Sequence, residues 1–248
     1  MSLPHRIEHV DRLDCIVEPW RWAYAEDNAA MIDARWNEAV ALKPKMFNGP
    51  ILLAHDATVE QRGHERVFAA RFFVTGYKNL FVSQQLGFPD RSAANCFAMA
   101  VLRSSDGTFL LGEMGPHTAN AGQIYSPAGT PDLDDVVADR LDLPGSVLRE
   151  MEEETGLAPS DVRVAPGSIV IFRGAQIACM SICELDMDAA TAEARISDWL
   201  ATQDQPELSR MHIIRSAADL QADRMPAFMA IFMEYMLKNK AGKPDGRT

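Results

Sequence analysis

The sequence of 248 residues predicts an α/β fold. Segments of helical composition alternate along the chain with short runs of β-branched and aromatic residues, which is the pattern of strands. The composition, 47% hydrophobic and 24% charged, is that of a soluble globular protein. We expect two domains, a small α+β domain at residues 1–90 and a larger one at 91–248, because Gly, Pro and charged residues cluster at 87–93.

One helix and three strands are predicted for the smaller domain. Residues 25–43 have helical composition with an apolar stripe, and the segment PKMFNGP at 44–50 ends the helix with two prolines and an Asn-Gly turn. Three runs that follow are rich in β-branched and aromatic residues and are predicted as strands, at 51–59, 66–77 and 80–86.

The larger domain opens with a predicted hairpin. Residues 95–114 form two apolar runs around Ser-Ser-Asp-Gly, a sequence that favours a turn. A short stretch that could be helical follows between two polar turns. Further strands are expected at 162–174, 176–187 and 211–215, and helices at 188–203, with an Asp start, and at 219–239, with a start or break near Pro226.

Composition and charge exclude several classes of function. A formal net charge of −11 argues against nucleic acid as the main partner, because affinity for that polyanion comes largely from basic patches. No apolar run reaches the roughly 18 residues of a membrane span, and the N-terminus lacks the apolar core of a signal peptide. We therefore expect a cytoplasmic protein with reduced, mostly buried thiols at Cys15, Cys96, Cys179 and Cys183.

The segment LREMEEETGL, residues 148–157, concentrates negative charge on a predicted helix. Glu150, Glu153 and Glu154 stand at i, i+3 and i+4, so they share one face with neighbours about 5–6 Å apart. Like charges at that spacing repel, and a hard divalent cation such as Mg²⁺ relieves the repulsion while it keeps positions for waters and phosphate oxygens. Ser146 is the predicted N-cap of this helix.

A run of glutamates is by itself more often a solvated helix face. Residues 149–157 nevertheless fit, at every defined position, the pattern R-E-U-x-E-E-x-G-U in which U is apolar. A chance match in a chain of this length is on the order of a few in 100,000. The pattern is the helical part of the box of the Nudix hydrolases, a MutT-like family that the chain resembles over about residues 93–240. Met151 and Leu157 are then expected to face the core, and Gly156 to supply the left-handed helix cap.

This resemblance implies an α/β/α sandwich with a mixed sheet between helices. It also implies metal-dependent hydrolysis of a nucleoside diphosphate linked to another moiety, with Mg²⁺ as the cofactor and Mn²⁺ as the alternative. Arg149 is suited to hold a carboxylate by a bidentate contact. The expected metal-binding residues are Glu150, Glu153, Glu154 and Gly129, and the expected catalytic residues are Arg149, Glu150, Glu153 and Glu207.

The spacing of the box departs from the usual pattern. Ser126-Pro127-Ala128-Gly129 resembles the loop that opens the box, but 20 residues separate Gly129 from Arg149 where 14 are usual. Six residues are inserted around PDLDDVVADRLD at 131–142, and the expected early glutamate is replaced by Leu141. The nearest substitute is Asp142, with Asp134 and Asp135 as less favoured ones. The inserted residues are expected beside the metal site, where they could touch substrate.

The insertion and the N-terminal segment resemble those of one particular subfamily of Nudix proteins. The chain is similar to two-domain Nudix proteins that hydrolyse UDP-glucose and UDP-galactose, through Trp36, Pro44, Phe47-Asn48-Gly49 and Ser146-Val147-Leu148. The implied substrate is a UDP-sugar, cleaved to UMP and a sugar phosphate. ADP-sugar or ADP-ribose hydrolysis is an alternative, and a nucleotide-sugar sensor without turnover is another.

Several residues are candidates for further roles at the site. Glu207 stands just before a predicted strand and is a candidate general base, although it could simply be an exposed loop carboxylate. Glu184 and Asp186 are rival candidates, and Glu150 or Glu153, acting through a metal-bound water, is favoured equally. Phosphate contacts could come from His117, Arg103 and Arg173. Stacking faces for a base are offered by Phe47, Phe81 and Tyr77, although core packing is the favoured role for each.

Overall fold

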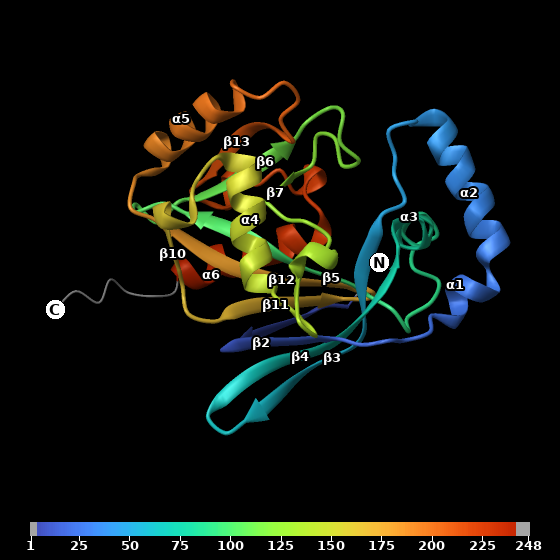
Figure 1. Cartoon of the computed structure of the whole chain (residues 1–248). Coiled ribbons are helices and arrows are strands. Elements are labelled where there is room, and N and C mark those ends of the chain that lie inside the picture. Colours follow the sequence, from blue (N-terminus) through green and yellow to red (C-terminus); the bar gives the residue numbers. More distant parts are fainter. Residues whose placement is uncertain (1–3, 242–248) are drawn as a thin grey trace. The chain divides into compact units, whose positions relative to one another are not determined.

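The structure is a computed structural model that describes residues 4–241, and its α/β class confirms the prediction (Figure 1). The chain forms two compact units and passes between them several times, so the predicted boundary at residue 90 does not coincide with this division. The prediction of a separate domain at residues 1–90 is tested by whether that fragment folds alone. Unit 1 comprises Met1–Ala98, Thr130–Ser146 and Gly167–Cys179, and unit 2 comprises Met99–Gly129, Val147–Pro166 and Met180–Thr248.

Unit 1 contains a five-stranded mixed sheet in the order β3-β4-β2-β9-β8. Strand β2 pairs in parallel with β4, whereas β3 with β4, β2 with β9, and β8 with β9 pair antiparallel. In addition, β1 (Arg6–Val10) pairs antiparallel with β11 (Ser168–Arg173). The sheet strands are β2 (Arg12–Val17), β3 (Pro50–Arg62), β4 (Glu65–Gly76), β8 (Val136–Val137) and β9 (Arg140–Leu141).

The helices of unit 1 correct one prediction. The expected helix at 25–43 is present as α1 (Ala23–Asp27) and α2 (Ala29–Leu42), separated at Asn28. The expected strand at 80–86 is wrong, because Tyr77–Gln85 forms helix α3. A short apolar run does not distinguish a strand from a helix, and here the Asn48 side chain, distant in sequence, accepts a hydrogen bond from the Lys78 N–H in the first turn.

The inserted residues also differ from the expectation. In place of a short helical stretch they form a 3₁₀ turn, η1 (Leu133–Asp135), followed by the β8–β9 hairpin. Strand β9 pairs with β2 near the start of the chain, through Ile16 and Arg140. The insertion is therefore part of the sheet of unit 1.

Unit 2 is built on antiparallel strands that confirm the predicted hairpin. Strand β5 pairs with β6 around the turn at residues 104–108, β6 pairs with β13 and with the short β7, and β10 pairs with β12. The first residues of β5 and β12 belong to unit 1. The strands are β5 (Asn95–Arg103), β6 (Phe109–Met114), β7 (Ile124–Tyr125), β10 (Val162–Val164), β12 (Gln176–Leu185) and β13 (Leu208–Ile214).

Three helices cover these strands, with α4 in front of them and α6 behind in Figure 1. Helix α5 begins as predicted after Asp188, whose carboxylate accepts a hydrogen bond from the Thr191 N–H at 2.8 Å. Helix α6 begins directly after Pro226, as predicted. The bounds are Leu143–Thr155 for α4, Ala189–Leu200 for α5 and Ala227–Ala241 for α6, and short 3₁₀ turns lie at Pro159–Asp161, Ala217–Asp219 and Ala222–Arg224.

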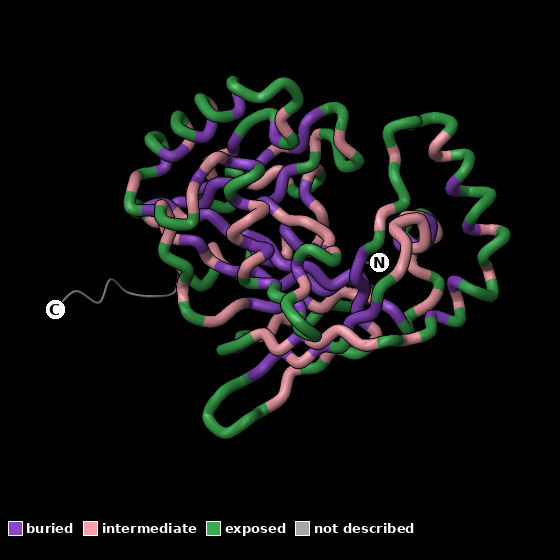
Figure 2. The backbone as a smooth tube through the Cα atoms, in the orientation of Figure 1, coloured by how far each residue is buried: buried purple, intermediate pink, exposed green. Residues whose placement is uncertain are grey.

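Buried residues concentrate in the strands, and the outer faces of α2 and α5 are exposed (Figure 2). All four cysteines are buried and free of disulfide bonds, which confirms the prediction for the thiols. Between residues 4 and 241, no helix combines the length and the apolar character that crossing a bilayer requires.

Candidate active site

The glutamates of the predicted box lie on helix α4, whose start differs from the prediction. The helix begins at Leu143, and the Asp142 carboxylate accepts a hydrogen bond from the Gly145 N–H at 3.0 Å. Asp142 is thus the capping residue. Ser146 is buried in the first turn of the helix, and its N–H donates a hydrogen bond to the Asp142 carbonyl. Asp142, the nearest substitute for the missing glutamate, has a structural role at the helix start.

The other end of α4 agrees with the prediction. Met151 and Leu157 are fully buried, as expected for the apolar positions of the pattern. Gly156 has a positive φ of 68° and ends the helix in the left-handed conformation. A Cβ at Gly156 would also lie 2.8 Å from Trp199 Cδ1 on α5, so the glycine allows the two helices to approach closely. These contacts fix the rotation of α4 and hence the directions of its glutamates.

A short loop at residues 126–129 faces the glutamates. The Ala100 N–H on β5 donates to the Pro127 carbonyl at 3.0 Å, which ties the loop to the sheet. A Cβ at Gly129 would lie 2.6 Å from Glu150 Cδ. Only glycine leaves room for the Glu150 carboxylate at this place, which accounts for Gly129 in the motif.

Glu154 is directed into the same loop and is only 5% exposed. Its Oε1 accepts a hydrogen bond from the Ala128 N–H at 3.1 Å, whereas its buried Oε2 has no hydrogen-bond partner within the described part of the chain. Burial raises the pKa of Glu154 to about 8; the Ala128 N–H opposes this shift, and the negative charges of Glu207, Glu150 and Glu153 add to it. A buried carboxylate without a full set of partners favours binding of a cation.

Glu150 and Glu153 share Arg149 as an ionic partner. Arg149 Nη1 lies 2.9 Å from Glu150 Oε1 and 3.5 Å from Glu153 Oε2. The Glu150 side chain is 16% exposed and the Glu153 side chain 60% exposed. Arg149 therefore pairs with two carboxylates through Nη1, and a bidentate contact with either one stays a prediction. Glu153 is the member of the trio that faces solvent.

The three glutamates do not form a closed metal cage. Throughout residues 4–241, no three His, Cys, Asp or Glu side chains converge closely enough to hold a metal ion. Glu150 and Glu154 converge on the loop at 128–129, and Glu153 points outward. The donors are all carboxylate or backbone oxygens, the ligand type that Mg²⁺ and Mn²⁺ prefer. Glu154 Oε2 is free to bind such an ion, and Gly129 leaves space beside the Glu150 carboxylate. Glu153 would contribute from the side that is exposed to solvent.

Glu207 directly precedes β13, as the sequence predicted. Its carbonyl accepts a hydrogen bond from the Gly115 N–H at 2.6 Å, which fixes its backbone beside the end of β6. Its negative charge contributes to raising the pKa of both Glu154 and Tyr125. The structure thus brings Glu207 into the electrostatic environment of Glu154.

Sequence reasoning did not single out Tyr125 or Asn120, and it named Ala128 only as a member of the loop, without its contact to Glu154. Tyr125 is buried, its hydroxyl accepts a hydrogen bond from Asn120 Nδ2 at 3.1 Å, and burial raises its pKa to about 12. Ala128 acts through its backbone N–H, so its side chain gives no signal of this contact. The polar Asn-Ala-Gly-Gln-Ile-Tyr segment next to the predicted loop was the available signal for Tyr125 and Asn120.

The other candidates for a base or a phosphate contact either lie outside the glutamate site or are engaged in ion pairs. Glu184 pairs with Arg103 and Arg163, so it is engaged as the partner of two cations. Arg173 belongs to unit 1, and the His117 ring lies beside Gly115.

The stacking candidates divide in the structure. Phe81 and Tyr77 contact Trp36 edge to face, which agrees with core packing. For Phe47 the prediction of core packing is wrong, because this residue is 78% exposed.

Comparison with known proteins gives similarity in structure only. No family profile and no curated protein sequence match the chain. Its structure is similar to a Nudix hydrolase, RenU, from M. smegmatis, with 16% identity, a TM-score of 0.40, and coverage of 62% of this chain and 90% of that one. It is also similar to a MutT protein from Methanosarcina mazei, with 19% identity, a TM-score of 0.39, and coverage of 60% and 96%.

A third similar structure is the Nudix domain of Shewanella oneidensis NrtR, which was crystallised with ADP ribose. The identity is 18% and the TM-score 0.38, with coverage of 65% of this chain and 98% of that domain. All three TM-scores lie below 0.5.

Proposed function

We propose that the chain is a Nudix-type hydrolase that uses a divalent metal ion to cleave the diphosphate of a nucleotide linked to another moiety. The observation that carries this proposal is the pair of carboxylates at the loop: Glu154, buried with one oxygen unpartnered, and Glu150, packed against Gly129. A solvated helix face would not bury a carboxylate in this way.

The reaction consumes one water, breaks one P–O bond of the diphosphate and gives two phosphate monoesters. Glu150, Glu153 and Glu154 would hold the metal, with Gly129 leaving the space that this requires. When bound, Mg²⁺ or Mn²⁺ offsets charge that develops on the phosphoryl group. Arg149 orients Glu150 and Glu153 through its ion pairs. Glu207 is the proposed base that takes a proton from the attacking water.

A UDP-sugar is the proposed substrate, with UMP and a sugar phosphate as products. The similarity of residues 36–49 and 146–148 to the UDP-sugar subfamily supports this choice. The net charge of −11 also favours a substrate whose diphosphate is neutralised by a metal ion. The proposed setting is the cytoplasm, where nucleotide sugars and reduced thiols coexist.

The decisive experiment is a product assay with a matched pair of variants. The protein is incubated with Mg²⁺ and a panel of UDP-sugars, ADP-ribose, CoA and dinucleoside polyphosphates, and nucleoside monophosphates are separated by chromatography. We expect release of UMP from UDP-sugars, abolished by EDTA. Glu154→Gln keeps the hydrogen bond from Ala128 but removes the charge, and should lower the rate at least about 100-fold.

The control is Glu152→Gln, which makes the same change of charge at an exposed position of the same helix. It should leave the rate within about twofold of wild type. AMP as the sole product would replace the UDP-sugar with an ADP-linked substrate. Tight binding of a UDP-sugar without any product, at every metal concentration, would instead indicate a sensor.

A further inference from the structure

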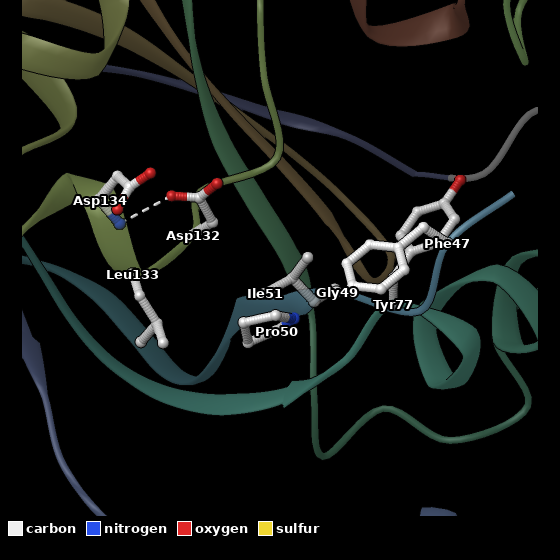
Figure 3. A pocket seen from close by; sticks show the side chains of 8 residues that line it. All are labelled: Phe47, Gly49, Pro50, Ile51, Tyr77, Asp132, Leu133 and Asp134. Atoms are coloured by element: carbon white, nitrogen blue, oxygen red, sulfur yellow. Dashed lines mark hydrogen bonds between the residues drawn. The ribbon is translucent and has the colours of Figure 1, made fainter. Parts of the chain in front are cut away.

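Unit 1 contains a pocket that the proposed hydrolysis does not use. Its cavity volume is about 450 Å³, and Figure 3 shows aromatic rings on one wall, acidic residues on the other and the start of β3 between them. The rings are Phe47 and Tyr77, and the opposite wall is Asp132, Leu133 and Asp134. All of these residues belong to unit 1.

Phe47 is exposed and directly precedes two residues that are hydrogen-bonded to the start of α3. Its neighbour Asn48 accepts a hydrogen bond from the Lys78 N–H at 2.8 Å, and the Gly49 carbonyl accepts one from the Tyr77 N–H at 2.9 Å. A Cβ at Gly49 would lie 3.1 Å from Phe47 Cε1, so the ring covers this glycine. A ring that is 78% exposed and adjoins anchored residues offers an apolar platform to a ligand.

The acidic wall is also fixed in place. The Pro131 carbonyl accepts a hydrogen bond from the Leu52 N–H at 2.8 Å, which ties the segment to β3. Asp132 Oδ1 accepts from the Asp134 N–H at 2.8 Å within the 3₁₀ turn. Asp134 is exposed, and Leu133 is 47% exposed between the two carboxylates.

The lining selects against anions and in favour of hydroxyl groups. The residues that line the cavity include two carboxylates and no Lys, Arg or His, so a phosphate would be repelled. A carboxylate accepts hydrogen bonds only, so the ligand must supply several donors. A ligand that covers Phe47 must also have an apolar face.

A sugar ring satisfies these conditions better than uracil, the base of the proposed substrate. A pyranose offers C–H groups on one face and several hydroxyl donors at its rim, which suits one aromatic platform opposite two acceptors. A uracil ring has a single N–H donor, and the wall opposite Phe47 presents Leu133 rather than a second flat ring. We propose that the pocket formed by Phe47, Tyr77 and the inserted residues Asp132–Asp134 binds the ring of a neutral hexose.

The proposal goes beyond the hydrolysis proposed for the carboxylate site and does not depend on it. The hexose could come from a free saccharide or from the sugar portion of a nucleotide sugar. Both sources present the same hydroxyl-bearing ring to the pocket.

Binding is tested on the full chain in EDTA, so that no turnover occurs. Methyl α-D-glucopyranoside and methyl α-D-galactopyranoside are titrated separately, and saturation-transfer NMR and protein chemical shifts report the contact. We expect Phe47→Ala to raise Kd roughly tenfold and Asp134→Asn to raise it several-fold. The controls Leu42→Ala, an exposed apolar side chain on α2, and Asp139→Asn, an exposed carboxylate of the same insertion, should bind as wild type.

Separate outcomes distinguish this proposal from the proposed hydrolysis. Glu154→Gln should bind both glycosides as wild type does, and loss of turnover in wild type would not affect this assay. UDP-glucose and UDP are then compared: if Phe47→Ala weakens only UDP-glucose, the nucleotide sugar is the source of the ring, and if it weakens neither, the source is a free saccharide.

Absence of glycoside binding to wild type would overturn the proposal. So would glycoside binding that Phe47→Ala and Asp134→Asn leave unchanged, in proteins whose circular dichroism matches wild type. Binding of uridine that depends on Phe47, without binding of either glycoside, would instead identify a base-binding pocket.

Discussion

At the scale of single residues, the candidate site depends on the fit between Gly129 and Glu150. A methyl group at position 129 would displace the Glu150 carboxylate, whose end is flexible and can move without unfolding the protein. We expect Gly129→Ala to lower kcat/KM roughly 100-fold with little change in Tm, because small misplacements of a catalytic group are costly. Steady-state kinetics and thermal unfolding measure the two effects, and a large fall in Tm without loss of specific activity would contradict the assignment.

Glu154 provides a second prediction, on stability rather than rate. Because a bound cation would partner its buried carboxylate, saturating Mg²⁺ should raise the Tm of wild type by roughly 5 °C. Glu154→Gln should show little of this increase, and Glu152→Gln should show all of it. The measurement is differential scanning fluorimetry in EDTA and in Mg²⁺, and an equal shift in all three proteins would indicate a metal site elsewhere.

The sequence predicts which residues of the site carry the chemistry better than it predicts where their side chains point. The spacing of Glu150, Glu153 and Glu154 predicts a shared helix face, and the structure places all three on α4. Sequence spacing could not show that Glu153 points to Arg149 and solvent while Glu154 is buried. The directions of these side chains depend on the loop at 126–129 and on the burial of Met151, which are tertiary contacts.

At the scale of elements, the β6–β13 pair is joined by an ionic cluster around Glu113. Glu113 on β6 accepts hydrogen bonds from Arg210 and His212 on β13, each at 2.8 Å, and forms an ion pair with Arg224 at 2.7 Å. Arg224 also donates to the Gly122 carbonyl at 2.9 Å. The cluster thus fastens the segment that leads to Tyr125.

This cluster predicts a dependence of stability on pH. Burial alone would raise the pKa of Glu113. Hydrogen bonds from His212, Arg210 and Arg224 outweigh this effect and lower the pKa to about 2, below its ordinary value of 4.5. A lowered folded-state pKa gives stability that is present above the unfolded-state pKa and is lost as pH falls toward 2. Glu113→Gln should therefore be less stable than wild type at neutral pH, with a difference that shrinks between about pH 4.5 and 2.

Chemical denaturation at several pH values measures this difference. The matched control is Glu38→Gln, an exposed carboxylate on α2, which should follow wild type across the same range. A destabilisation of Glu113→Gln that stays constant down to pH 2 would mean that lost packing, rather than charge, causes it.

The start of α4 gives a further prediction. Asp142→Ala removes the carboxylate that accepts from the Gly145 N–H, so we expect a loss of about 1 kcal/mol in the free energy of unfolding. Asp139→Ala, at an exposed position before β9, should cost little. Urea denaturation compares the two, and equal stability of both variants would show that the cap contributes nothing.

Elements fixed by local pattern were predicted well, whereas elements fixed by distant partners were not. The hairpin at 95–114 and the helix after Asp188 follow from turn, cap and periodicity signals close in sequence. Strands β1 and β2 were missed, since their partners β11, β4 and β9 lie more than 50 residues away along the chain. Helix α3 was mistaken for a strand for the same reason, because Asn48 stabilises its start.

At the scale of the whole molecule, the division of the chain bears on how much of it can fold alone. A fragment of residues 1–90 would contain β1 without β11 and β2 without β9. We expect this fragment to lack cooperative thermal unfolding, since strands without partners leave backbone groups unsatisfied and apolar faces exposed. Circular dichroism of the purified fragment measures this, and a cooperative transition would support an independent domain at 1–90.

The pairing of β1 with β11 also constrains the order of events during synthesis. The ribosome must add roughly 90 residues after position 90 before unit 1 is complete at Cys179, which takes on the order of 5 to 20 s at ordinary elongation rates. For that interval β2 and β3 can already pair with β4, but β1 is finished and still lacks its partner β11. The nascent chain is therefore expected to need chaperone protection early, at its N-terminal strand, rather than after release.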